Sequence, residues 1–202
     1  MYLKDVIYAA NDGIITTFAV VAGVAGAALD PAIVLILGVA NLLADGFSMA
    51  ASDYLATKSE EEYLARDGNH VGKTRSKKAA TITFFSFVIA GLLPILPYAF
   101  LKGPPDVFWV SVVFTGSALF IVGACRARWT GKNWFSSGLE MLLIGGVAAF
   151  IAYFVGAFIK NLVSKLSVQS KTKSEFIKEI LSLSKLSKKE VISISLFILF
   201  NF

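Results

Sequence analysis

The chain has 202 residues, of which 56% are hydrophobic and only 16% are charged, and its formal net charge is +5. A soluble globular domain carries about 25% charged residues, so this composition excludes an ordinary soluble enzyme and indicates a multi-pass membrane protein. The positive charge does not indicate nucleic-acid binding, because the basic residues fall in loops and a tail, where membrane topology explains the loop charges. The single cysteine, Cys125, excludes a disulfide within the chain. We expect it to be a small packing residue near a helix end.

The hydropathy pattern predicts an all-α membrane protein with five spanning helices, each near the ~18–20 apolar residues that cross a bilayer. The predicted spans are residues 6–29, 31–56, 79–100, 107–125 and 137–159. No charged leader with a cleavage site precedes the first span, so we expect no cleavable signal peptide. Asp30 and Pro31 form a short turn, with Pro31 in the first turn of the next helix. The first two spans are therefore antiparallel neighbours.

The second span carries polar side chains inside an apolar stretch. Asn41, Asp45, Met49 and Asp53 are four residues apart, so on a helix they form one slowly drifting stripe. An ionisable residue inside a membrane is costly and indicates a functional site. With Asp12 of the first span, the aspartates form a series at increasing depth from the cytosol. Carboxylate, amide and thioether ligands suit a divalent ion such as Fe²⁺ or Mn²⁺; the alternative is that these groups only hold helices together.

Beyond the second span the chain becomes polar. We expect the helix to continue through Glu60, Glu61 and Glu62. These glutamates either attract cations to the opening of a path or form a solvated helix face. Residues 57–78 as a whole make a short cytosolic loop, in which the only histidine, His70, is predicted to be exposed.

The later spans carry fewer polar groups. Pro94 and Pro97 must break or kink the third span. We expect Glu140, near the start of the fifth span, to pair with Arg126 or Arg128, although it could instead line the path. The chain has no phosphate loop, no HExxH motif and no Cys/His cluster, so we predict that it is not an enzyme and binds no cofactor.

Basic residues set the predicted topology. Six lie in the loop between spans two and three and three in the loop between spans four and five. The positive-inside rule therefore places both loops and the N-terminus in the cytosol. Residues 161–202 form a lysine- and serine-rich tail that we predict to be disordered or interfacial.

Several segments together resemble the vacuolar iron transporter family. The resemblance covers about residues 4–160, in order. It lies in DGIITTFA at 12–19, ADGFSMA at 44–50, YLATKSE at 54–60, GLLPILPY at 91–98 and SGLEMLLIGG at 137–146.

This resemblance implies a five-span homodimer that moves Fe²⁺ or Mn²⁺ out of the cytosol in exchange for protons, along a path at the dimer interface. Asp12 corresponds to the family's first-span aspartate, Asp45 to a position where many members have glutamate, and Met49 to a methionine of the path. Asp53 lies one turn further, where members vary. Plant and parasite members carry a long glutamate-rich domain after the second span, whereas this chain has only residues 57–78, as in short prokaryotic-type members. The expected location is a plasma membrane in a prokaryote or a vacuolar or other internal membrane in a eukaryote.

Overall fold

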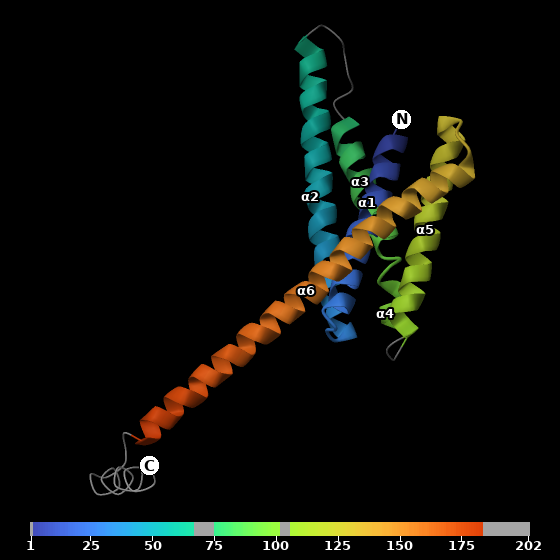
Figure 1. Cartoon of the computed structure of the whole chain (residues 1–202). Helices are drawn as coiled ribbons and strands as arrows, with labels where there is room; N and C mark the ends of the chain where they lie inside the picture. Colours follow the sequence, from blue (N-terminus) through green and yellow to red (C-terminus); the bar gives the residue numbers. More distant parts are fainter. Residues whose placement is uncertain (1, 67–74, 102–105, 184–202) are drawn as a thin grey trace, which may run out of the picture. The chain divides into compact units, whose positions relative to one another are not determined.

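The structure, a computed structural model, describes residues 2–66, 75–101 and 106–183, which form helices joined by short turns. This confirms the predicted all-α class. His70 lies outside the described residues. Figure 1 shows the helices. In chain order they are α1 (Leu3–Gly26), α2 (Pro31–Arg66), α3 (Arg75–Gly91), α4 (Leu96–Phe100), α5 (Asp106–Thr130) and α6 (Trp134–Leu183).

The chain divides into two compact units, Met1–Phe158 and Ile159–Phe202. The first unit holds α1 to α5 and the first part of α6. In the second unit, α6 continues to Leu183, well past the predicted end of the fifth span at residue 159. The prediction that the tail is disordered or interfacial stays a prediction.

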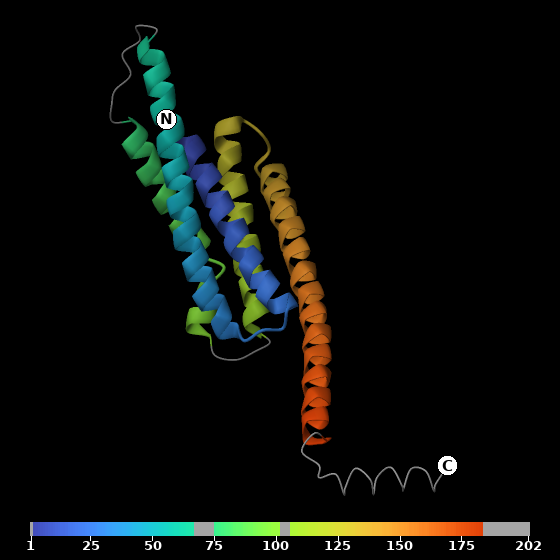
Figure 2. The ribbon, with the colours of Figure 1, turned by 90° about the vertical axis from the view of Figure 1, so that its left-hand side faces the viewer.

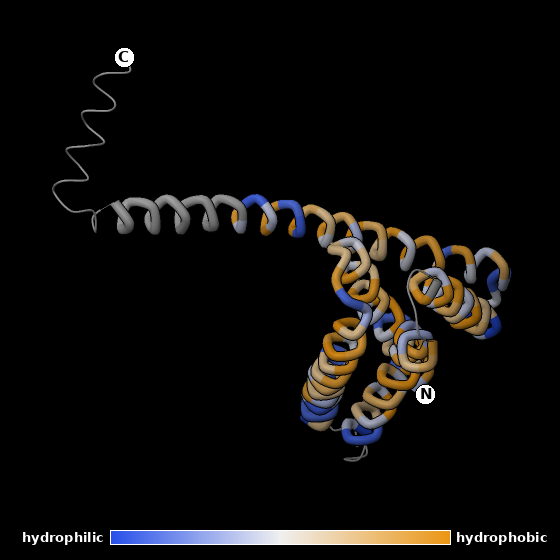
Figure 3. The backbone as a smooth tube through the Cα atoms, turned by 90° about the horizontal axis from the view of Figure 1, so that it is seen from below, coloured by the Kyte–Doolittle hydropathy of each residue, from blue (hydrophilic) through white to orange (hydrophobic). Residues whose placement is uncertain are grey.

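Four of the described helices are long and apolar enough to cross a membrane: α1, α2, α5 over Val107–Thr130, and α6 over Trp134–Ser167. Hydrophobic residues dominate these helices in Figure 3. The chain is therefore a multi-pass membrane protein. The region predicted as the third span, residues 79–100, instead consists of α3, a turn and the five-residue α4, so five complete crossings remain a prediction.

Proline accounts for the interruption between α3 and α4. Pro94 lies in the turn and Pro97 in the first turn of α4, where a missing backbone N–H does no harm. The carbonyl oxygen of Pro94 accepts a hydrogen bond from Ser111 Oγ of α5 at 2.6 Å, and this bond is buried. A neighbouring helix thus satisfies a backbone group that the break leaves free, as irregular backbone inside a membrane requires.

Helix α1 lies at the centre of the first unit and packs against α2, α3 and α5. Glycine allows the closest approach: a Cβ atom at Gly13 would lie 2.5 Å from the backbone oxygen of Phe87 in α3. The side chains of Leu42 from α2 and Phe87 are completely buried in the same cluster. This packing fixes the positions of α1, α2 and α3, the three helices that carry the candidate site.

The described basic residues of the first unit gather at one end. Figures 1 and 2 show that the start of α1, the end of α2, the start of α3, the end of α5 and the start of α6 lie at this same end. The predicted topology requires this grouping. That this end faces the cytosol is still a prediction. The described basic residues here are Lys4, Lys58, Arg66, Arg75, Lys77, Lys78, Arg126, Arg128 and Lys132.

Candidate functional site

The polar stripe predicted on the second span lies along one edge of α2. Asn41, Asp45, Met49 and Asp53 are all half-buried, and each lies beside the buried face of the helix. We call these four residues the α2 stripe. The stripe is thus neither sealed in the core nor exposed on the outer face, the location expected for groups that contact a permeating ion or a neighbouring polar group.

A second polar face runs along α1. Asp5, Tyr8 and Asp12 are spaced three and four residues apart, so they share one side of the helix. Asp5 and Asp12 are half-buried, whereas Tyr8 is exposed. Because α1 and α2 are antiparallel, the order of polar groups on α1 runs opposite to that of the α2 stripe.

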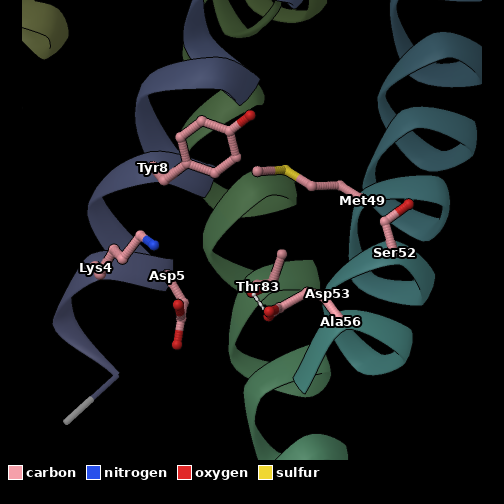
Figure 4. Close-up of a pocket in the computed structure, with 8 residues that line it drawn as sticks. All are labelled: Lys4, Asp5, Tyr8, Met49, Ser52, Asp53, Ala56 and Thr83. Atoms are coloured by element: carbon pink, nitrogen blue, oxygen red, sulfur yellow. Dashed lines mark hydrogen bonds between the residues drawn. The ribbon is translucent and has the colours of Figure 1, made fainter. Parts of the chain in front are cut away.

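The two faces meet in a pocket of about 560 Å³ that α3 also lines. Figure 4 shows the Met49 thioether extending from α2 toward Tyr8 of α1, and Asp5 and Asp53 entering from opposite sides nearer the basic end. The pocket is lined by Lys4, Asp5, Tyr8, Met49, Ser52, Asp53, Ala56 and Thr83.

Electrostatic coupling relates the aspartates of the two helices at two levels. The charges of Asp5 and Asp53 interact, and so do those of Asp12 and Asp45. Met49 lies between the two levels on α2, because it is four residues from both Asp45 and Asp53. Two of the predicted aspartates, Asp12 and Asp45, thus face each other across the two helices, and Asp53 faces Asp5, which the sequence analysis did not select.

Hydrogen bonds orient the carboxylates of the α2 stripe. Thr83 Oγ1 of α3 donates to Asp53 Oδ2 at 2.6 Å, and Thr57 Oγ1 donates a longer bond of 3.4 Å to Asp53 Oδ1. Asn41 Nδ2 donates to Asp45 Oδ2 at 3.3 Å. Asp53 is thus held between two helices, while Asn41 supports Asp45 from within α2.

A second pocket, of about 410 Å³, continues from the first toward the basic end and shares Lys4, Asp5, Asp53 and Ala56 with it. Glu60 also lines this pocket and lies 3.7 Å from Arg75 across an exposed ion pair. Acidic and basic side chains therefore line this second pocket together. The full lining is Tyr2, Lys4, Asp5, Asp53, Ala56, Thr57, Glu60, Arg75 and Ala79.

The other predicted glutamates have structural partners. Glu61 accepts hydrogen bonds from Ser76 N at 3.1 Å and from Ser76 Oγ at 3.2 Å, so its carboxylate caps the first turn of α3. It lines neither of the two pockets. Glu62 pairs with Lys58 at 3.8 Å on the exposed surface of α2.

Glu140 pairs with Arg126, which confirms the pairing that the sequence analysis favoured. Cys125, in contrast, is exposed, so its predicted role as a packing residue is wrong.

Six residues that line the 560 Å³ pocket were missed by the sequence analysis: Lys4, Asp5, Tyr8, Ser52, Ala56 and Thr83. The spacing of seven residues between Asp5 and Asp12 puts both on one helix face and could have identified Asp5. No local pattern identifies Thr83, because its role depends on the packing of α3 against α2. Within the described ranges, no three His, Cys, Asp or Glu side chains lie close enough together to hold a metal ion.

The fold and the site define a multi-pass helical membrane protein with a polar, acid-lined face between two of its helices. Residues 3–73 and 64–157 match the profile of the VIT family. These segments make up most of the chain, which therefore belongs to the VIT family.

Known relatives agree with this assignment. The chain is 26% identical to vacuolar iron transporter 1 of Arabidopsis thaliana, over 79% of this chain and 86% of the relative. It is 27% identical to vacuolar iron transporter 1 of Oryza sativa, over 75% and 82%, and 26% identical to the vacuolar iron transporter of Plasmodium falciparum, over 81% and 84%. All three are named as transporters, in agreement with the prediction that the chain is not an enzyme.

Proposed function

We propose that this protein carries a divalent transition metal, Fe²⁺ or Mn²⁺, out of the cytosol in exchange for protons. The observation that supports the proposal most is the facing arrangement of donors on α1 and α2: Asp5 with Asp53, Tyr8 beside Met49, and Asp12 with Asp45. The names of the family relatives supply iron as the first metal to test.

The order of ligands along the helices suggests the route. A cation from the basic end first meets Asp5 and Asp53, then Met49, and then Asp12 and Asp45. Asp12 lies seven residues beyond Asp5, about 10 Å deeper along α1. Carboxylates at both levels attract a dication, and the thioether between them favours a borderline metal over Mg²⁺ or Ca²⁺.

Proton exchange follows from the chemistry of the ligands. A carboxylate binds metal only when it is ionised, so protons and metal compete for the same oxygen atoms. Protonation of Asp12 or Asp45 on the acidic side of the membrane would release the metal there. The returning carrier would then bring the proton back to the cytosol.

The proposal includes a homodimer with the path between its two copies. Asp12, Asp45 and Met49 are only half-buried in one chain, so one side of the polar face remains open to a partner. Two carboxylates from each chain become four around a two-fold axis. Phe47, on the neighbouring surface of α2, is 71% exposed and offers apolar area for the contact.

The test is metal flux into liposomes that contain the purified full-length protein, with Fe²⁺ and Mn²⁺ and with imposed pH gradients of both signs. We expect Asp45→Asn to lower flux about 100-fold, because even outer partners of metal ligands typically contribute 10- to 100-fold. Asp30→Asn is the matched control. Asp30 lies in the turn before α2 and accepts a hydrogen bond from the backbone N–H of Ala32, which asparagine also accepts.

Two other functions are separated by the same assay. A non-transporting membrane assembly protein would give no flux above empty liposomes, and Asp45→Asn would then change only stability. A channel would conduct metal at a rate that does not depend on the pH gradient. Metal flux that an opposing proton gradient accelerates, and that Asp45→Asn removes, supports the antiporter alone.

A further inference from the structure

A separate groove lies at the corner between α5 and α6, at the same end of the first unit as the basic helix termini. It has a volume of about 900 Å³, and none of the residues of the acid-lined site contributes to it. The groove is lined by Phe120, Ile121, Ala124, Cys125, Ala127, Arg128, Gly131, Lys132, Asn133 and Trp134.

Tight packing of the two helices forms the base of this corner. A Cβ atom at Gly123 would lie 2.4 Å from the backbone oxygen of Ser137, so the two backbones nearly touch. The ring of Phe120 packs edge-on against Trp134 at 6.0 Å between centroids. Gly131 adopts a φ of +67° in the connecting turn, a conformation that glycine adopts without strain. The groove is therefore built on a well-packed hairpin.

The rim of the groove is basic. Arg128 and Lys132 line it, and in the part of the chain that the structure describes neither has a carboxylate within ion-pair distance. Arg126, by contrast, is engaged by Glu140. The described residues of the lining include no Asp or Glu, so the charge they contribute is positive.

The floor of the groove is apolar and extends into the membrane-spanning part of α5. Ile121, which is 59% exposed, lies seven residues before Arg128, which is about 10 Å along the helix axis. Trp129 and Trp134 are exposed beside the rim, and tryptophan side chains favour the level of lipid headgroups. The basic rim thus lies at headgroup level and the floor at the level of acyl chains.

An anionic amphiphile matches both halves of this groove. A free anion would use the two basic side chains but not the apolar floor. A zwitterionic lipid would use the floor, but the cation of its headgroup would be repelled by the two basic side chains. Basic pockets between membrane helices on the cytosolic side bind the headgroups of acidic phospholipids. We propose that the α5–α6 groove is a binding site for an anionic phospholipid, with its phosphate between Arg128 and Lys132 and an acyl chain along Phe120, Ile121 and Ala124.

Cys125 provides a reporter at the site, because it is the only cysteine of the chain, is exposed and lines the groove. The experiment measures the rate of maleimide alkylation of the full-length protein in mixed micelles. The added lipid is phosphatidylglycerol or phosphatidylcholine, and glycerol phosphate serves as the free headgroup. Each rate is divided by the rate of the same variant without added lipid, which removes intrinsic differences in thiol reactivity.

We expect phosphatidylglycerol to slow alkylation in proportion to its occupancy, with little effect of phosphatidylcholine or glycerol phosphate. Arg128→Gln with Lys132→Gln should raise the lipid fraction needed for half-protection about 25-fold, a factor of about five for each basic residue. The matched control, Lys77→Gln with Lys78→Gln, removes two charges from exposed positions of α3 at the same end. It should keep the protection, and monodisperse gel filtration of each variant establishes that it is folded.

Three outcomes would overturn the proposal. Equal protection by phosphatidylcholine would show a groove that takes any lipid, and protection by glycerol phosphate alone would show a simple anion site. Protection by phosphatidylglycerol that survives in the Arg128 and Lys132 double variant would show that the basic rim does not bind the headgroup.

Discussion

The hydrogen bond between Thr83 and Asp53 links α3 to the α2 stripe, and removing it is the sharpest test of the site's geometry. The oxygen atoms are 2.6 Å apart, and Thr83 is only 2% exposed. Hydrogen bonds to charged groups contribute about 1.5–3 kcal/mol. Because Asp53 is only half-buried, we take the lower end and expect a coupling energy of about 1.5 kcal/mol.

A double-mutant cycle measures this coupling. Thr83→Val, Asp53→Ala and the double variant are compared with the unmodified protein by reversible unfolding in mixed detergent micelles. Thr83→Ser keeps the hydroxyl group and should retain most of the coupling. Thr81→Val is the control on the same helix, because Thr81 is exposed and its hydroxyl donates to a carbonyl of its own helix. Its effect should add independently to that of Asp53→Ala.

A coupling energy within the roughly 0.5 kcal/mol that independent sites show would refute the bond and the placement of Asp53 against α3. If the proposed transport is also correct, Thr83→Val should raise the metal concentration for half-maximal flux about tenfold, as loss of a partner that orients a ligand typically does. The unfolding measurement does not depend on transport, so the two results can be judged separately.

Two further variants test the packing that positions the site. Gly13→Ala should destabilise the protein by about 1–3 kcal/mol, the usual cost of overpacking, because the new Cβ would lie 2.5 Å from a backbone oxygen of α3. The control Gly146→Ala, where nothing lies within 4 Å, should be neutral or stabilising. If an unfolding assay showed Gly146→Ala to be the more destabilising of the two, the contact between α1 and α3 would be contradicted. Ser111→Ala should lower the free energy of unfolding by about 1–3 kcal/mol, because it leaves the buried Pro94 carbonyl without its partner. Ser117 is exposed, so the control Ser117→Ala should change the unfolding midpoint little. Equal effects of the two variants would argue against the hydrogen bond from Ser111.

The α2 stripe illustrates what could be predicted from the sequence. Asn41, Asp45, Met49 and Asp53 recur every four residues in an apolar stretch, and helix geometry alone places them on one side. The interruption after α3 was likewise predictable, because Pro94 and Pro97 cannot donate backbone hydrogen bonds. The pairing of Glu140 with an arginine followed from the short turn between two helices, which brings their charged ends together.

Other features depended on contacts between helices that no local pattern records. The sequence analysis left open whether Glu61 attracts cations to the opening of a path or forms a solvated helix face, and the structure shows its carboxylate capping α3 instead. The sequence analysis expected Cys125 to pack inside, but the rotation of α5 leaves it exposed. Both differences arise because a helical period specifies which residues share a side but not what that side contacts.

The sequence by itself determined the class of protein, the helical elements and the polar stripe, because hydropathy and helical spacing act within a few turns of one segment. Only the tertiary structure decided that Asp5 lies opposite Asp53, that Thr83 holds this carboxylate, and that Tyr8 lies beside Met49. Those relations depend on the rotation and register of three packed helices. Close contacts at residues such as Gly13 fix that rotation and register, and they appear only once the helices are packed together.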